Sequence, residues 1–211
     1  MIRIITGSAK GMKLKTLEGL DTRPTTGRTK EAIFSMIQFD IEGRDVLDLF
    51  AGSGQMGLEA LSRGAASAVF VDNSAAAMAV IKENATHTRL YDRSKFRISD
   101  VRNFLRKAGA LKRRASLEDT KDGTGAFDLV FIDPPYDKGL LTDTLIKLAE
   151  SGLLRPSAII VCECSKDENP NGDPKIAALY DVVKINSYGS ALISVLTPAK
   201  EEATGADAEQ D

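Results

Sequence analysis

From about residue 45 onward, short apolar runs alternate with amphipathic stretches. Strands are predicted near 45–50, 67–72, 95–99, 127–132 and 157–163, with helices between them. The run Phe127-Asp128-Leu129-Val130-Phe131-Ile132 is apolar at nearly every position, as in a strand that is covered on both faces of its sheet. Strands that alternate with helices predict an α/β fold with a doubly wound, mostly parallel sheet.

A hairpin is predicted at each end of this alternating region. Segments 2–6 and 12–17 are expected to pair near the amino end, and a helix over about 28–39 follows them. Near the carboxyl end, segments 180–187 and 190–197 are expected to pair around a turn at Tyr188-Gly189.

These patterns divide the chain into three parts. Residues 1–40 are expected to form an N-terminal extension, and residues 41–199 the main domain. Residues 200–211 are expected to form an acidic, disordered tail, since five acids and no base lie in 201–211. Within the main domain, Gly109 through Ala126 is predicted to be a long loop whose first half is basic.

The predicted strand 127–132 runs directly into Asp133-Pro134-Pro135-Tyr136. Open α/β sheets bind ligands at the carboxyl ends of their strands. The exocyclic amine of a nucleobase could donate its two N–H groups to the Asp133 carboxylate and the Pro134 carbonyl, which the prolines hold rigidly. These acceptors would stabilise charge developing on the nitrogen, and Tyr136 could stack on the base, worth roughly 1–3 kcal/mol. The alternative is an ordinary turn after a buried strand.

A glycine-rich turn follows the strand predicted at 45–50. The segment Ala51-Gly52-Ser53-Gly54-Gln55-Met56-Gly57 leads into a helical pattern, which is the context in which a ligand approaches the backbone closely. The next strand ends in Asp72, 20 residues beyond Gly52. An acid at that place can accept hydrogen bonds from both hydroxyls of a ribose.

Two cofactor classes fit this turn. The segment from Gly52 to Gly57 matches the dinucleotide fingerprint of nicotinamide and flavin dehydrogenases. The other class is the S-adenosylmethionine-dependent methyltransferases, in which an acid on the first strand lies near the cationic methionine end of the cofactor, as Asp48 could. A pyrophosphate would gain nothing from that carboxylate. Together with the amine site at Asp133, Asp48 favours methyl transfer.

The chain from residue 2 to 197 resembles the RsmD family, bacterial methyltransferases that act on the 2-amino group of one guanine in small-subunit (16S) ribosomal RNA. The early Thr22-Arg23-Pro24-Thr25-Thr26 points to this family, because many methyltransferases share the glycine turn and the amine site. Two departures are visible: Gly27 replaces an acidic residue, and Gln55-Met56 replaces a small or aliphatic pair. The likeness also includes Gly11–Lys15, Arg28, Lys30-Glu31-Ala32, Phe34, Leu47–Gly54, Glu59–Ala65 and Tyr188-Gly189.

The resemblance implies a class I S-adenosylmethionine-dependent methyltransferase fold, which is Rossmann-like with a terminal antiparallel hairpin, plus a small N-terminal extension. In that fold the position of Asp100 typically meets the adenine, although Asp100 could also cap the helix that begins at Val101. The catalytic residues are expected to be Asp133, Pro134, Pro135 and Tyr136. The cofactor-binding residues are expected to be Asp48, Phe50, Ala51, Gly52, Gly54, Asp72, Asn73, Asp100 and Val101.

A net charge of −2 conceals an uneven distribution along the chain. Residues 1–200 carry +3, and residues 1–30 carry seven bases against two acids. The basic amino end predicts that residues 1–40 contact the phosphates of RNA, and the basic first half of the loop over 109–126 could face RNA as well. The alternative is solvated charge on a small hairpin. The RNA-binding residues are expected to be Lys10, Lys13, Lys15, Arg23, Thr25 and Arg28.

Cysteine and histidine offer little chemistry. Cys162 and Cys164 are expected to be free thiols on one face of a strand, in a reducing compartment. His87 is the only histidine, near the end of a predicted helix, so neither a metal site nor a catalytic histidine is expected. With no signal segment and no run of about 20 apolar residues, a cytoplasmic, monomeric protein is expected.

Three alternative functions remain open. An adenine-specific DNA methyltransferase could use the same amine site, although no target-recognition domain is visible in 211 residues. A dehydrogenase would bind a nicotinamide cofactor. A non-catalytic RNA-binding protein could keep the fold, but it would have no use for a rigid amine site.

Overall fold

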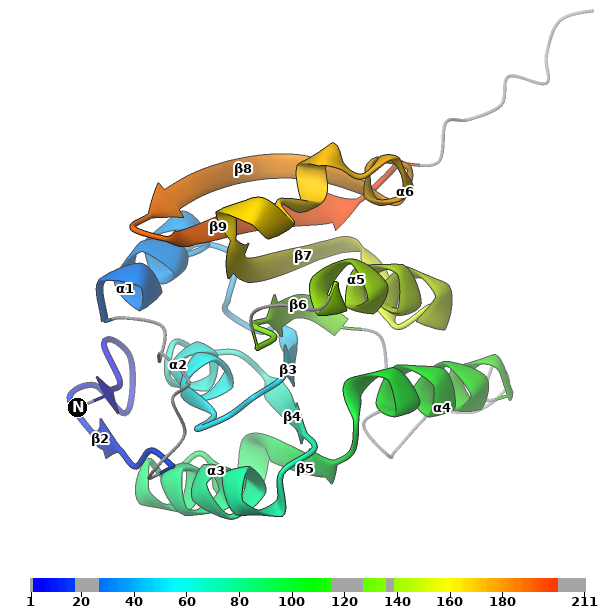
Figure 1. Ribbon diagram of the computed structural model, residues 1–211. Helices are drawn as coiled ribbons and strands as arrows, with labels where there is room; N and C mark the ends of the chain where they lie inside the picture. The colour runs from blue at the N-terminus through cyan, green and yellow to red at the C-terminus, as the bar shows by residue number, and fades with distance from the viewer. Residues whose placement is uncertain (1, 18–26, 115–126, 136–138, 201–211) are drawn as a thin grey trace, which may run out of the picture.

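A seven-stranded sheet runs through the computed structural model, which describes residues 2–17, 27–114, 127–135 and 139–200 (Figure 1). The strand order is β5-β4-β3-β6-β7-β9-β8; the first five strands are parallel, and β9 is antiparallel to both of its neighbours. The strands are β3 (Asp45–Leu49), β4 (Ser67–Asp72), β5 (Ser94–Ile98), β6 (Phe127–Ile132), β7 (Leu154–Ser165), β8 (Tyr180–Tyr188) and β9 (Ala191–Pro198).

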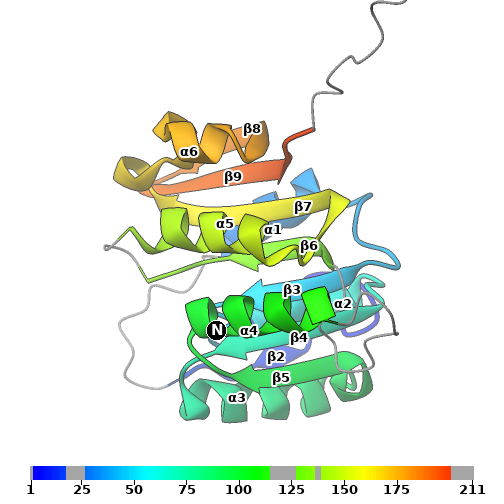
Figure 2. The ribbon, with the colours of Figure 1, turned by 90° about the vertical axis from the view of Figure 1, so that its right-hand side faces the viewer.

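Helices cover both faces of this sheet (Figures 1 and 2). On one face, an apolar core that includes Phe34, Phe70 and Phe131 lies under α1 (Gly27–Met36), α2 (Gln55–Ser62) and α3 (Ala75–His87). On the other face, a second core lies under α4 (Val101–Arg114) and α5 (Leu140–Ser151). Every residue of β6 is buried, as predicted for a strand between two helical layers. The remaining helical segments are α6 (Pro174–Ala177) and the 3₁₀ turns Tyr91–Arg93, Lys166–Glu168 and Pro170–Gly172.

The strand order reverses between β3 and β6. From β3 the chain moves outward through β4 to β5, and then returns to the other side of β3 to form β6. Open sheets bind ligands in the crevice at such a switch point. The register pairs Asp48 with Phe131 and Leu49 with Ile132, so the glycine turn and the Asp133 segment leave the sheet side by side.

The fold class and the terminal hairpin are confirmed, but the first hairpin is shorter than predicted. Only β1 (Ile2–Arg3) and β2 (Lys13–Leu14) pair as strands. The backbone N–H groups of Ile5 and Thr6 instead donate to the Glu59 carboxylate on α2, at 2.7 and 3.0 Å. At these two residues the carboxylate of Glu59, distant in the sequence, therefore takes the place of the expected strand partner.

The predicted loop over 109–126 is wrong for its first six residues, because α4 continues to Arg114. At Gly109, a Cβ would lie 2.7 Å from the Ser151 carbonyl oxygen, so α4 packs closely against the end of α5 there. This contact overrides the low helix propensity of glycine, about 1 kcal/mol below alanine. The rest of the predicted loop, residues 115–126, lies outside the described residues.

Candidate active site at the carboxyl edge of the sheet

The turn after β3 has the backbone of a ligand-binding loop. Gly52 and Gly54 have positive φ values of 55° and 75°, and Phe50 adopts φ 60° although it is not glycine. Strain at a non-glycine residue persists only where its surroundings enforce it, as at functional sites. Ala51 and Gly54 are buried, and Phe50 and Gly52 are half-buried.

Asp72 closes this turn from the end of β4. Its Oδ2 accepts from the Gly52 N–H at 2.9 Å, and its Oδ1 accepts from the Ser74 N–H at 2.8 Å. A carboxylate has about four acceptor positions, so Asp72 keeps capacity for hydroxyl donors. The Asp72 side chain is therefore fixed in orientation at the predicted ribose position, with the exposed Asn73 beside it.

Asp48 lies beneath the turn and is only 3% exposed. Its Oδ2 accepts from the Gly57 N–H at 2.9 Å. Burial raises the pKa of Asp48 to about 8; the Gly57 hydrogen bond opposes this shift, and the charges of Asp133 and Asp72 add to it. Ionisation of Asp48 would be favoured by a cation placed next to it.

Gly57 is a site residue that the sequence reasoning missed, although it lies in the fingerprint. A Cβ at Gly57 would come within 2.4 Å of Phe70 Cε1 and 3.1 Å of Asp48 Oδ2. Only glycine lets the first turn of α2 approach the Asp48 carboxylate this closely. The third glycine of the dinucleotide fingerprint allows a helix to pack closely on a strand, so its spacing in the sequence could have identified Gly57.

Asp133, Pro134 and Pro135 follow β6 at the switch point. Asp133 is half-buried, Pro134 is buried and Pro135 is exposed. Asp133 is close enough to Asp48 for its charge to raise the pKa of that carboxyl. Tyr136, predicted to stack on a base, lies outside the described residues.

The end of β5 adds the predicted adenine position. The Ser99 N–H donates to the Asp72 carbonyl at 2.9 Å, which holds this end beside Asp72. Asp100 Oδ1 accepts from the Asn103 N–H at 3.2 Å, so the predicted helix cap is confirmed, and Val101 is buried in the first turn of α4. Ile98 is 59% exposed, which leaves an apolar side chain uncovered next to Asp72.

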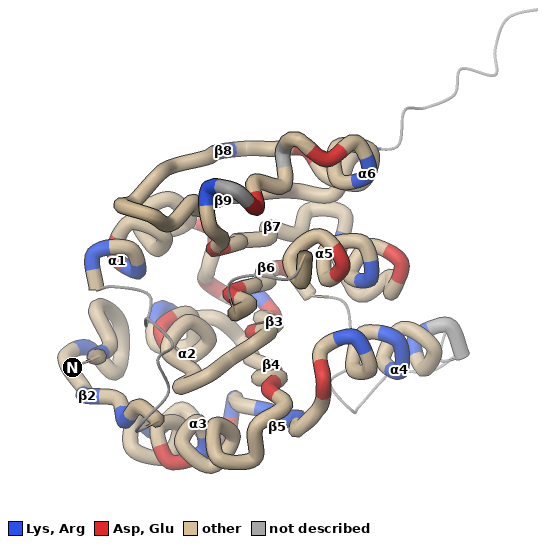
Figure 3. The backbone as a smooth tube through the Cα atoms, in the orientation of Figure 1, with Lys and Arg blue, Asp and Glu red and all other residues tan. Residues whose placement is uncertain are grey.

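The basic residues of the amino end divide into two groups. Lys10, Lys13 and Arg28 are exposed, and Lys15 is exposed in an ion pair with Glu83. Lys30 is instead buried and contributes nothing to the basic surface. Figure 3 shows basic positions on the hairpin and the start of α1. Arg23 and Thr25 lie outside the described residues.

Lys30 belongs to a buried ionic cluster that joins the extension to α2. Its Nζ lies 2.9 Å from Glu59 Oε2 and donates to the Arg3 carbonyl at 3.0 Å. Glu59, 0% exposed, also accepts from Arg63 Nε at 2.9 Å and from two backbone N–H groups of the hairpin. Burial lowers the pKa of Lys30, and Glu59 opposes that shift. The cluster fixes the extension to the sheet domain.

Asn84 makes a second such joint, which the sequence did not signal. Its buried side-chain amide bonds both backbone groups of Lys15, at 2.8 and 3.0 Å, and donates to the Ser53 carbonyl at 2.9 Å. The amide thus bridges the end of the hairpin and the glycine turn.

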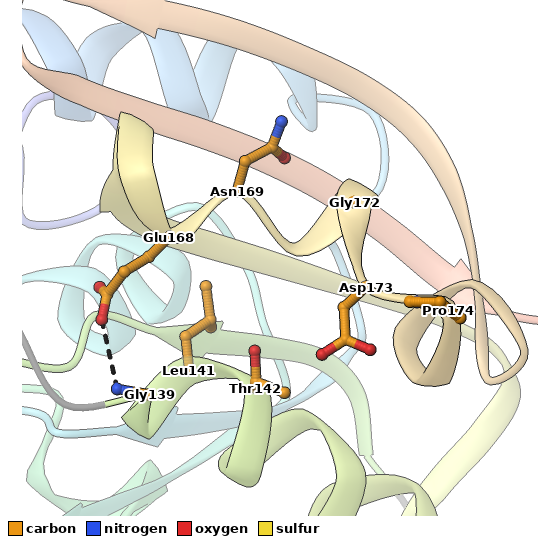
Figure 4. A pocket seen from close by; sticks show the side chains of 8 residues that line it. All are labelled: Gly139, Leu141, Thr142, Glu168, Asn169, Gly172, Asp173 and Pro174. Atoms are coloured by element: carbon orange, nitrogen blue, oxygen red, sulfur yellow. Dashed lines mark hydrogen bonds between the residues drawn. The ribbon is translucent and has the colours of Figure 1, made fainter.

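A separate hollow of about 460 Å³ lies at the start of α5, between that helix and the turns after β7 (Figure 4). Glu168 Oε1 accepts from the Gly139 N–H at 3.4 Å across it, and Asp173 lines another side. None of the residues expected to bind the cofactor or the amine lines this hollow, so it is separate from the candidate site at the strand ends.

Other chemistry is sparse in the part of the chain that is described. No group of three or more histidine, cysteine or acidic side chains there could hold a metal ion. Cys162 and Cys164 are buried free thiols, and His87 is exposed in the last turn of α3. No helix among these residues is both long and apolar enough to cross a membrane.

This chain is similar to several known proteins. The family described as Conserved hypothetical protein 95 matches residues 2–196. Ribosomal RNA small subunit methyltransferase D of Escherichia coli K12 is 35% identical over 186 residues, covering 86% of this chain and 82% of its own. A solved hypothetical protein of Thermus thermophilus has a TM-score of 0.72 at 28% identity, covering 92% of this chain and 98% of its own. The solved ribosomal protein L11 methylase of Lactobacillus delbrueckii shares the fold, with a TM-score of 0.62 at 17% identity. The match covers 83% of this chain and 81% of its own.

Proposed function

Because this chain belongs to the RsmD family, we propose that it is an rRNA methyltransferase that modifies the 2-amino group of a guanine in small-subunit (16S) ribosomal RNA. The methyl donor in this proposal is S-adenosylmethionine. The observation that carries it is the switch point, where the glycine turn with Asp48 and Asp72 adjoins Asp133-Pro134-Pro135.

The residues at the turn fit that cofactor. Asp48 is buried with a pKa of about 8, so a cationic methionine end would stabilise its ionised form. Asp72 is oriented by two backbone hydrogen bonds for a ribose, and the exposed Ile98 offers an apolar surface for an adenine. A negatively charged pyrophosphate would disfavour ionisation of Asp48 and would gain nothing from its carboxyl, which disfavours the dehydrogenase alternative.

The protein's part in the chemistry is alignment and charge stabilisation. When bound, S-adenosylmethionine supplies a methyl group activated by its sulfonium. Asp133 and the Pro134 carbonyl would accept the two N–H groups of the guanine amine and let its lone pair point at that carbon. The methyl group would pass from sulfur to the amine nitrogen with the C–S electron pair left on sulfur, and the surplus proton would leave to Asp133 or water.

RNA would approach from the amino end of the chain. Lys10, Lys13, Lys15 and Arg28 are exposed there, and Asn84 and the Lys30–Glu59 pair hold the extension against the catalytic half. The target guanine must leave its stack, since its 2-amino group cannot align with the methyl group inside one.

Transfer of labelled methyl to undermodified small ribosomal subunits, to their free RNA and to duplex DNA tests the proposal. We expect the label in 2-methylguanosine, and the ratio of subunit to free RNA identifies the form that is recognised. Label in methyladenine would keep the amine site and overturn the guanine assignment. Absence of label with all three substrates would contradict the proposal.

A further inference from the structure

A second carboxylate lies beside Asp133 on the neighbouring strand. The register pairs Ile132 with Cys162, so Asp133 and Glu163 occupy adjacent positions at the carboxyl ends of β6 and β7. Phe131 and Val161 belong to the core under α1–α3, whereas Ile132 and Cys162 belong to the opposite core. Because side chains alternate between faces, Asp133 and Glu163 share the α1–α2 face.

Both carboxylates line one small hollow. Its volume is about 10 Å³, and its other walls are formed by the apolar residues Ile33, Met56, Phe131, Ile132 and Val161. Glu163 is only 7% exposed. The hollow has room for one polar group and not for a ring, so only the edge of a base could enter. In this low-dielectric setting, a correctly placed donor would be held strongly, and a misplaced acceptor rejected.

Two adjacent acceptors match guanine and not adenine. Guanine carries N1–H next to its 2-amino group, so its Watson–Crick edge presents neighbouring donors. Adenine carries an acceptor at N1 beside its amine. The Asp133 site alone holds an exocyclic amine and does not distinguish these bases.

Resting on the proposed function, we propose that Glu163 accepts the N1–H of the target guanine and thereby selects guanine over adenine. Sites built to hydrogen-bond a substrate N–H can reject analogues lacking it by about 10⁴–10⁵, because the buried acceptor then has no donor from the base. Repulsion between a carboxylate and the N1 lone pair of adenine acts in the same direction.

The test uses an analogue that keeps the reacting amine. In 2-aminopurine the 2-amino group remains, but N1 is an acceptor. Small-subunit RNA carrying guanosine or 2-aminopurine riboside at the mapped target would be assayed with the wild type and with Glu163→Gln. The glutamine amide can donate to N1, so we expect at least a tenfold shift of the kcat/KM ratio toward 2-aminopurine, with guanosine turnover reduced.

Two controls separate this result from a general defect. Glu42→Gln changes an exposed glutamate before β3 and should leave the ratio at the wild-type value. S-adenosylmethionine affinity, measured by calorimetry, should be unchanged in Glu163→Gln if the fold is intact. Equal loss on both substrates, or unchanged guanosine turnover, would overturn the role of Glu163 while leaving the proposed function standing. A wild type that does not methylate guanosine would overturn both.

Discussion

Acidic side chains follow one another along the carboxyl edge of the sheet: Asp100 after β5, Asp72 on β4, Asp48 on β3, Asp133 after β6 and Glu163 on β7. Asp48 shows the electrostatic consequence, since burial and two neighbouring charges raise its pKa. An edge of this kind disfavours phosphate and favours hydrogen-bond donors and cations. That selectivity suits an amine and a sulfonium cofactor.

Removal of the Asp133 carboxylate should abolish turnover. In Asp133→Ala one acceptor of the guanine amine is missing, so developing charge on the nitrogen is not stabilised, and we expect a fall in kcat of at least about 10²-fold. Cofactor affinity should stay within a few-fold of the wild type. Single-turnover methyl transfer and calorimetry measure the two quantities, and near-normal turnover would refute the amine site.

Because of Asp48, the free energy of unfolding should fall as the pH rises. In the unfolded chain its carboxyl ionises near pH 4, whereas in the folded protein its pKa is about 8. Between these values the folded state binds a proton that the unfolded state lacks, so the free energy of unfolding decreases with rising pH. Asp48→Asn should flatten this dependence in urea unfolding between about pH 5 and 8. If the free energy of unfolding of the variant depends on pH as steeply as that of the wild type, the raised pKa of Asp48 is contradicted.

At the scale of elements, two buried joints connect the N-terminal extension to the sheet domain. The Lys30–Glu59 pair links α1 and the hairpin to α2, and Asn84 links the hairpin to the glycine turn through α3. Because the second joint touches Ser53, the segment proposed to bind RNA and the turn proposed to bind cofactor share one side chain.

Asn84→Leu should weaken both segments. The change leaves the backbone groups of Lys15 and the Ser53 carbonyl without this partner, so we expect about 2–3 kcal/mol less free energy of unfolding. Cofactor affinity should fall roughly tenfold, about 1.4 kcal/mol, because the turn loses support. Thr86→Ala, an exposed change on the same helix, serves as the matched control. Lower stability with unaltered cofactor affinity would limit Asn84 to a structural role.

At the scale of the whole molecule, basic positions lie on the hairpin and the start of α1, and others lie on β5 and α4, whereas acidic ones occur near β3, β4 and β6 (Figure 3). In the proposed complex the extension would hold RNA phosphates while a base reaches the acidic edge of the sheet.

Replacing Lys10, Lys13 and Arg28 by glutamine should reduce the salt dependence of RNA binding. For each phosphate that is no longer neutralised, the slope of log affinity against log salt should decrease by about 0.7–0.9. Filter binding across a salt series measures this slope, with Lys184→Gln on β8 as the control. If the slope equals that of the wild type, the basic extension does not bind phosphate.

The sequence alone determined the order of strands and helices, the glycine turn and the Asp133 segment, because these depend on local periodicity and on residues close in the chain. Tertiary structure decided what depends on distant partners. Lys30 became a buried ion-pair residue because Glu59 faces it, Gly109 became helical because α4 packs on α5, and Asn84 became a bridge across three segments. The adjacency of Asp133 and Glu163 arises likewise, since only the pairing of β6 with β7 brings these distant positions together.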